Sequence, residues 1–106
     1  MKLTERIQIG YLMARRDIKM GRSSAAYKDE RYGDAYKHVN EAIDYELRAV
    51  VLSRRVGIET MDLREELRSL KRIRNACLEL MSYTALEDAV RNHAEMREIR
   101  KIFGKS

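Results

Sequence analysis

The sequence predicts an all-α protein, a compact antiparallel four-helix bundle formed by a single domain over residues 1–106. The chain has no Pro and only five Gly, so it lacks the turn residues that punctuate β-sheet folds. Its apolar residues return every three or four positions, which is the period of amphipathic helices. Charged residues make up 37% of the chain, as expected of solvated helix faces. A chain of this length is sufficient for one hydrophobic core.

The strongest helical signal covers residues 34–56, which contain neither Gly nor Pro. Four apolar residues of this segment lie seven positions apart and therefore share one side of a helix. Glu46 lies in the middle of this apolar face. These repeating residues are Ala35, Ala42, Ala49 and Val56. The sequence does not fix where this helix starts, because Gly33 predicts a break in front of it. Residues 24–32 form either a short helix of their own or the first turns of the central one.

A first helix is expected over residues 2–20. One stripe of apolar residues at steps of three and four is predicted to face the core; it consists of Leu3, Ile7, Tyr11, Ala14 and Ile18. Gly10 within this helix would let another helix approach closely. Gly21 is expected to end the helix, and Ser23 or Ser24 can cap the segment that follows.

Gly57 is predicted to end the central helix, because Gly is the residue most often found just after a helix C-terminus. The third helix is then expected over residues 61–82, starting within a few residues of Asp62. Its core stripe contains Leu63, Leu67, Leu70, Cys77 and Met81. The connection between the two helices is short, which favours antiparallel neighbours.

A fourth helix is predicted over residues 85–103, because the apolar phase changes around residues 82–84. Thr84 and Glu87 also have the spacing of a capping box, in which each side chain bonds the amide of the other. A single, slightly kinked helix is the alternative, since no Gly or Pro enforces a turn there.

Three polar residues fall on predicted core faces: Glu46 in the central helix, Arg74 in the third and His93 in the fourth. A buried charge is costly unless it is paired, so Glu46 and Arg74 are expected to meet and to fix the register of their helices. The alternative is a functional acid, cation and imidazole that line one pocket.

The charge of the chain is basic, with a formal net charge of +5 and 22 Lys and Arg residues. Six of these residues form a predicted basic strip at the end of the central helix and along one flank of the third: Arg54, Arg55, Arg64, Arg68, Lys71 and Arg72. Like charges four residues apart, as at Arg68 and Arg72, slightly destabilise a helix. Because the cluster of cations costs stability, a function in binding is the favoured explanation for it. The expected partner is an acidic protein surface or a nucleoprotein complex, and nucleic acid is the second candidate.

Several functional classes have little support in the sequence. Cys77 is the only cysteine, so no disulfide can form within the chain. The two histidines, His38 and His93, do not follow a Glu at metal-ligand spacing, so neither a metal nor a cofactor is expected. The segment around Gly57 has features of a helix-turn-helix, but acidic residues open the helix that would meet DNA. No apolar run is long enough to span a membrane, and a cytoplasmic protein is expected.

Six residues lie between Arg31 and His38, and this spacing resembles the motif of HEPN-type RNases, which are helical bundles with four to six residues between an Arg and a His. The resemblance covers eight residues and implies an RNase in which Arg31 and His38 act together. Tyr32 stands where that family usually has a polar residue, and the family's motif lies later in its bundle.

The function expected from these patterns is that of a small, non-enzymatic accessory or regulatory binding protein, such as an inhibitor from a phage or mobile element. Direct binding of RNA or DNA through the basic strip is the alternative. The third is an enzyme that uses Arg31 with His38, or Glu46 with His93. A homodimer is left open.

Overall fold

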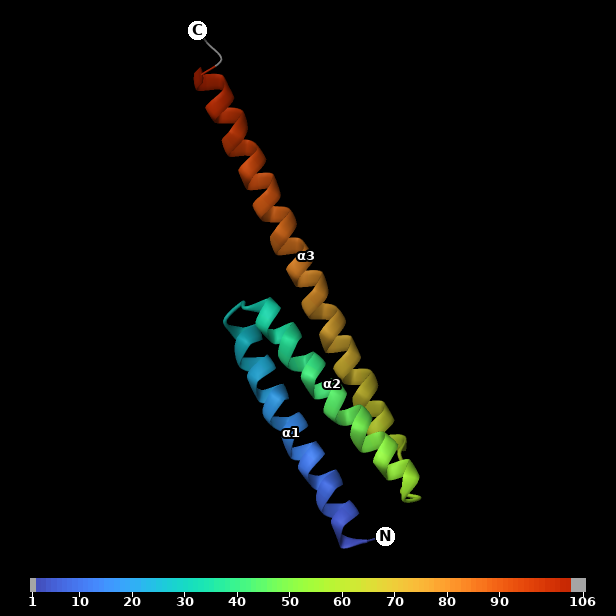
Figure 1. Cartoon of the computed structure of the whole chain (residues 1–106). Coiled ribbons are helices and arrows are strands. Elements are labelled where there is room, and N and C mark those ends of the chain that lie inside the picture. The colour runs from blue at the N-terminus through green and yellow to red at the C-terminus, as the bar shows by residue number, and fades with distance from the viewer. Residues whose placement is uncertain (1, 104–106) are drawn as a thin grey trace.

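The computed structural model describes residues 2–103, and among them every side chain except those of residues 89, 90 and 92–103. The described chain folds into three helices: α1 (Leu3–Lys28), α2 (Tyr32–Arg55) and α3 (Met61–Phe103). α1 and α2 form an antiparallel hairpin, and α3 runs back along α2, so that α2 lies between the other two helices (Figure 1). The molecule measures 81 × 19 × 16 Å. The all-α class is confirmed, but the compact four-helix bundle is wrong.

The first correction concerns α1, which does not end at Gly21 but continues to Lys28. Ser23, expected near a break, is buried inside the hairpin, where its hydroxyl donates a hydrogen bond of 2.8 Å to the carbonyl of Ala35. The chain instead reverses at Glu30, whose φ is +60°. The amide of Arg31 bonds the carbonyl of Ala26 at 2.9 Å, the long hydrogen bond of a Schellman-type C-cap.

The second correction concerns the predicted third and fourth helices, which are one continuous helix, α3. The hydroxyl of Ser82 donates to the carbonyl of Leu78, and that of Thr84 donates to the carbonyl of Leu80, both at 3.0 Å. These bonds run back by four residues within a helix. Thr84 therefore does not cap a new helix, and the phase change leaves the backbone uninterrupted.

The boundary between α2 and α3 is confirmed. α2 ends at Arg55, Gly57 has a φ of +80°, and α3 starts at Met61. The amide of Ile58 bonds the carbonyl of Ser53 at 2.8 Å, which gives this end of α2 the same type of cap as the end of α1.

The core follows α2 and is built mainly from small side chains. One cluster consists of Val39, Ala42, Ile43 and Leu70, with Met20 and Leu67 packed against it. A second cluster joins all three helices through Ala26, Ala35 and Cys77. Small residues at these positions allow the helix axes to approach closely.

The apolar stripe of α1 that was predicted to face the core lies instead on the outside of the hairpin. Leu3, Ile7, Tyr11 and Ile18 are 72%, 62%, 59% and 44% exposed, and Ala14 is also exposed. The face that packs on α2 carries a mixed set of residues: Ile9, Leu12, Arg16, Lys19, Ser23 and Ala26. α1 therefore has apolar residues on two sides, and the side that meets α2 is the more polar of the two.

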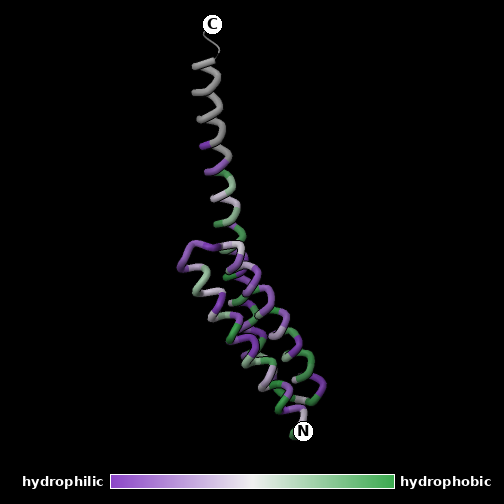
Figure 2. Tube along the Cα trace, turned by 60° about the vertical axis from the view of Figure 1, so that its left-hand side comes forward, coloured by the Kyte–Doolittle hydropathy of each residue, from purple (hydrophilic) through white to green (hydrophobic). Residues whose placement is uncertain are grey.

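The second half of α3 extends beyond the end of the hairpin (Figure 1). All residues from Ser82 to Asp88 are exposed, including Tyr83 at 64% and Leu86 at 60%. Hydrophobic positions, green in Figure 2, continue along the helix just past the hairpin. No helix of the described chain has an apolar stretch that could cross a membrane.

Candidate functional site

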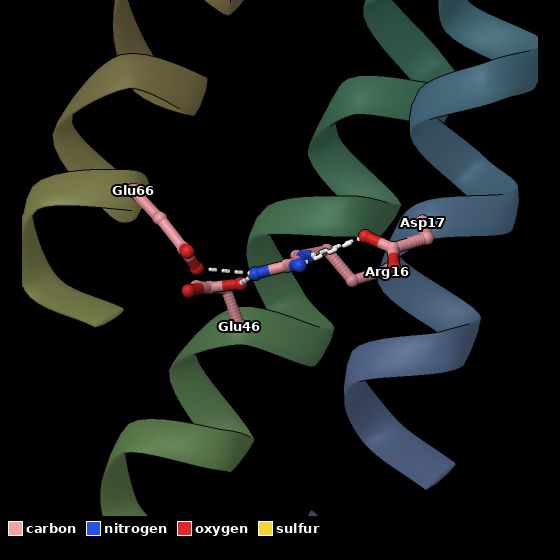
Figure 3. A network of polar contacts seen from close by, with 4 residues as sticks. All are labelled: Arg16, Asp17, Glu46 and Glu66. Carbon is pink, nitrogen blue, oxygen red and sulfur yellow. Dashed lines mark hydrogen bonds and ion pairs between the residues drawn. The ribbon is translucent and has the colours of Figure 1, made fainter. Parts of the chain in front are cut away.

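The most polar part of the interior is a network centred on Arg16 of α1. One terminal nitrogen of its guanidinium donates to Glu46 Oε2 of α2 at 2.7 Å and also contacts Glu66 of α3. The other terminal nitrogen donates to Asp17 at 2.8 Å. Figure 3 shows how the guanidinium extends from α1 to the two carboxylates on the neighbouring helices. A single cation thus connects all three helices.

Glu46 is fully buried, at 0% exposure, and its Oε1 has no hydrogen-bond partner among the described residues. Burial is the main cause that raises the pKa of Glu46 to about 7. The nearby Glu66 carboxylate raises this pKa further, and the Arg16 guanidinium offsets only part of the increase. Burial tends to lower the pKa of Arg16, but hydrogen bonds to Glu46 and Asp17 outweigh it and raise the pKa. Arg16 therefore stays protonated while Glu46 exchanges a proton near neutrality.

The predicted partner of Glu46 was wrong. Arg74 is half-buried on α3, and its guanidinium donates to its neighbour Asn75 at 3.3 and 3.4 Å. It lies eight residues after Glu66, about 12 Å further along the helix. The prediction that Glu46 is a buried, paired charge is correct, but the cation comes from α1. The side chain of His93 lies outside the described residues.

A second ion pair joins the two helices of the hairpin. Lys19 Nζ lies 2.6 Å from Glu41 Oε2, with side chains 12% and 34% exposed. The hydrogen bond from Lys19 lowers the pKa of Glu41 more than partial burial raises it. Sequence reasoning missed Arg16 and Lys19. The signal that could have found them is their spacing with Leu12 and Ser23, which places all four on one face.

The six residues of the basic strip are all exposed. Arg54 and Arg55 end α2, and the other four lie on a flank of α3 that does not face α2. Within the part of the chain whose side chains are described, none of the six forms an ion pair. The cations that form ion pairs in this part of the chain all lie outside the strip: Arg16, Lys19, Arg31 and Arg48.

Arg31 and His38, the pair that resembles the HEPN motif, lie near the turn between α1 and α2. Arg31 is the residue before α2 and forms ion pairs with Asp34 at 3.0 Å and Asp29 at 3.5 Å. His38 is half-buried on α2, and its Nδ1 is buried without a hydrogen-bond partner among the described groups. The guanidinium of Arg31 is thus already held by two carboxylates.

Cys77 is fully buried between Ala26 and Ala35, and burial raises the pKa of its thiol. A buried thiol of this kind is a poor nucleophile, since the thiolate is the reactive form. Among the described residues, no three His, Cys, Asp or Glu side chains converge on a position suited to a metal ion.

Comparisons with protein families, curated proteins and solved structures find no match to this chain. The fold defines an all-α protein made of a helical hairpin and a long third helix. Its polar interior connects the helices through Arg16, and the six cations of the basic strip lie on the surface.

Proposed function

We propose that the chain is a non-enzymatic accessory or regulatory protein that binds an acidic surface of a protein partner through the basic strip. The observation that carries this proposal is the set of six exposed cations without an ion pair in the described chain. Exposed charges of one sign that lie close together raise the local concentration of oppositely charged partners and accelerate association.

The buried polar residues support a structural role rather than catalysis. Glu46 is held by Arg16 in the interior, with its carboxylate at 0% exposure. A catalytic acid must reach its substrate within hydrogen-bond distance, and Glu46 is enclosed by three helices. The candidate acid of the sequence is therefore part of the helix packing.

The neighbourhood of the strip favours a protein over a nucleic acid as partner. Further along α3, exposed apolar residues follow the cations: Leu78, Tyr83 and Leu86. Two acidic residues are exposed nearby: Glu65 lies between Arg64 and Arg68, and Glu79 follows Leu78. A surface that combines apolar and charged residues is typical of protein interfaces, whereas contacts to phosphates come mainly from cations and do not call for neighbouring apolar residues.

The test is capture of partners from an intact host lysate with the wild-type chain and with Arg68→Glu/Arg72→Glu. We expect the double reversal to abolish capture of an acidic protein while the free energy of unfolding changes by within about 0.5 kcal/mol, as for most surface substitutions. The control, Arg22→Glu/Lys37→Glu, makes the same change in net charge at exposed positions outside the strip and should retain capture.

Identical capture by the wild type and by Arg68→Glu/Arg72→Glu would overturn the proposal. A generic RNA or DNA oligonucleotide provides the second arm. Binding that weakens steeply with salt and is lost in Arg68→Glu/Arg72→Glu would replace the protein partner with nucleic acid. Cleavage of RNA that is lost in His38→Ala would instead establish the RNase alternative.

A further inference from the structure

The outer face of α1 is an apolar surface that no other part of the described chain covers. It consists of Leu3, Ile7, Gly10, Tyr11, Ala14, Ile18, Gly21 and Ala25, all of which are exposed. Its large side chains are 44–72% exposed. A helix with apolar residues on two opposite sides is typical of a helix that is covered on both. The hairpin partner α2 covers only one side.

Two glycines lie on this face without a reason inside the molecule. A Cβ atom added at Gly10 or at Gly21 would meet no atom within 4 Å. A Gly in a helix interior is less favourable for stability than an Ala at the same position. No intramolecular contact offsets this cost, because both positions face open space. Glycine on a helix face is useful where another backbone approaches closely.

The face also repeats every eleven residues. Ile7 and Ile18 are eleven apart, and so are Gly10 and Gly21; Leu3, Ala14 and Ala25 continue the same interval. A repeat of eleven corresponds to 3.67 residues per turn, close to that of a straight α-helix. The face therefore stays on one side of α1 along its whole length, about 33 Å from Leu3 to Ala25.

We infer that the outer face of α1 binds the same face of a second copy of this chain, in an antiparallel pair with a two-fold axis at Ala14. In this register each Leu and Ile of the face lies opposite a small residue, whereas Tyr11 lies opposite Asp17 at the edge of the face. Ile7 faces Gly21 of the second copy, Ile18 faces Gly10, Leu3 faces Ala25, and Ala14 faces Ala14. A two-fold interface requires a self-complementary surface, and the order of large and small residues along α1 has this property.

The charges of α1 are compatible with this pairing. The face from Leu3 to Ala25 carries no charged residue. Among the cations that flank this face, Arg15 lies over the ring of Tyr45 at 5.8 Å and Lys19 binds Glu41, whereas Arg6 and Arg22 are exposed. With both copies counted, the exposed Leu, Ile and Tyr side chains supply on the order of 1,000 Å², near the lower limit for a specific interface.

The dimer is independent of the proposed function, because it uses α1 rather than the basic strip. Its first test measures the mass of the full chain by sedimentation equilibrium over a range of concentrations. We expect a monomer–dimer equilibrium. Gly10→Leu/Gly21→Leu should raise the dissociation constant of the dimer by tenfold or more, because the new side chains fill the space required by Ile18 and Ile7 of the second copy. Helix content should not fall, because Leu has a higher helix propensity than Gly and a Cβ atom at either position meets no atom within 4 Å apart from its own helix backbone.

The matched control is Gly33→Leu, which adds the same side chain at an open position of α2, outside this face. It should dimerise like the wild type. A chain that remains monomeric at all concentrations would overturn the inference, as would a dimer that Gly10→Leu/Gly21→Leu does not weaken.

The register has its own test. Ala14→Cys places two thiols at the two-fold axis, within the Cα separation that a disulfide bridges, and should give a disulfide-linked dimer on mild oxidation. Ala25→Cys should not, because the two thiols would be about 33 Å apart. The native Cys77 is buried and common to both variants. Cross-linking of Ala25→Cys but not Ala14→Cys would exclude the antiparallel pairing.

Discussion

Arg16 and Glu46 are thirty residues apart in the chain, and the guanidinium of one donates to the carboxylate of the other at 2.7 Å across the α1–α2 interface. The pair is unequal in exposure, since 15% of the Arg16 side chain and none of the Glu46 side chain is accessible. Arg16 also contacts Glu66, which is 48% exposed and can be solvated without its partner. Glu46 therefore depends on Arg16, whereas Glu66 does not.

We expect strong energetic coupling between Arg16 and Glu46. Arg16→Met alone leaves a buried carboxylate without its cation and should cost about 3 kcal/mol, the lower end of the range for a broken buried ion pair. The lower end applies because Glu46 can take up a proton. Arg16→Met/Glu46→Leu removes both charges and should cost less than the sum of the single changes. Urea denaturation of the four proteins in a double-mutant cycle measures the coupling.

The control for this cycle pairs Glu46→Leu with Arg74→Met. Arg74 bonds only its neighbour Asn75 among the described side chains, so the two effects should add to within about 0.5 kcal/mol. Additive effects for Arg16 and Glu46 would show that the contact contributes nothing to stability.

The stability of the fold should fall as pH rises from about 4.5 to about 7. The pKa of Glu46 is raised from 4.5 to about 7 in the folded chain, mainly by burial, so the folded state binds this proton more tightly than the unfolded state. The stabilisation is complete below the unfolded value and is lost as pH rises through the folded value. One pKa unit corresponds to about 1.4 kcal/mol, which bounds the loss at about 3 kcal/mol.

Denaturation midpoints between pH 4.5 and 8 check this dependence. Glu46→Gln removes the titrating group and should flatten the difference between pH 5 and pH 7. Glu66→Gln removes the neighbouring carboxylate that raises the pKa of Glu46 and should reduce the slope in part. Glu41, whose pKa is lowered, acts with the opposite sign and below this window. A Glu46→Gln protein with an unchanged slope would assign the dependence to other groups.

Ala85→Pro distinguishes a continuous α3 from two separate helices. If a helix began at Ala85, Pro would occupy its first position, where it is favourable. In a continuous helix, Pro removes a hydrogen bond and clashes with the preceding turn, at about 3 kcal/mol. We expect far-UV circular dichroism to show less helix, with an almost unchanged unfolding midpoint, because Ala85 is exposed beyond the hairpin.

The matched control is Ala76→Pro, which introduces the same residue into the part of α3 that packs on α2 next to Cys77. This variant should lower the unfolding midpoint strongly. A wild-type helix content in Ala85→Pro would contradict the continuous helix.

The two reversals of the chain show why one turn could be predicted and the other could not. Gly57 and Glu30 both have positive φ, at +80° and +60°. Glycine adopts this conformation without a steric cost and is therefore recognisable as a C-cap in a sequence. Glutamate in the same position carries no such signal. Gly21 was expected to end a helix and yet lies inside α1, whereas Gly33 is the second residue of α2, directly after the turn.

The local pattern by itself determined that the chain is helical, that the face from Ala35 to Val50 is buried, and that Glu46 is a paired charge. These properties follow from the period of apolar residues and from the cost of an unpaired charge, which act within one segment. The tertiary structure decided which cation reaches Glu46 and which face of α1 meets α2. The face with Arg16 packs inward because it combines a cation for Glu46 with small Ser23 and Ala26, which let the helices approach. The more apolar face of α1 stays outside, because the interior of a single chain has room for only one side of that helix.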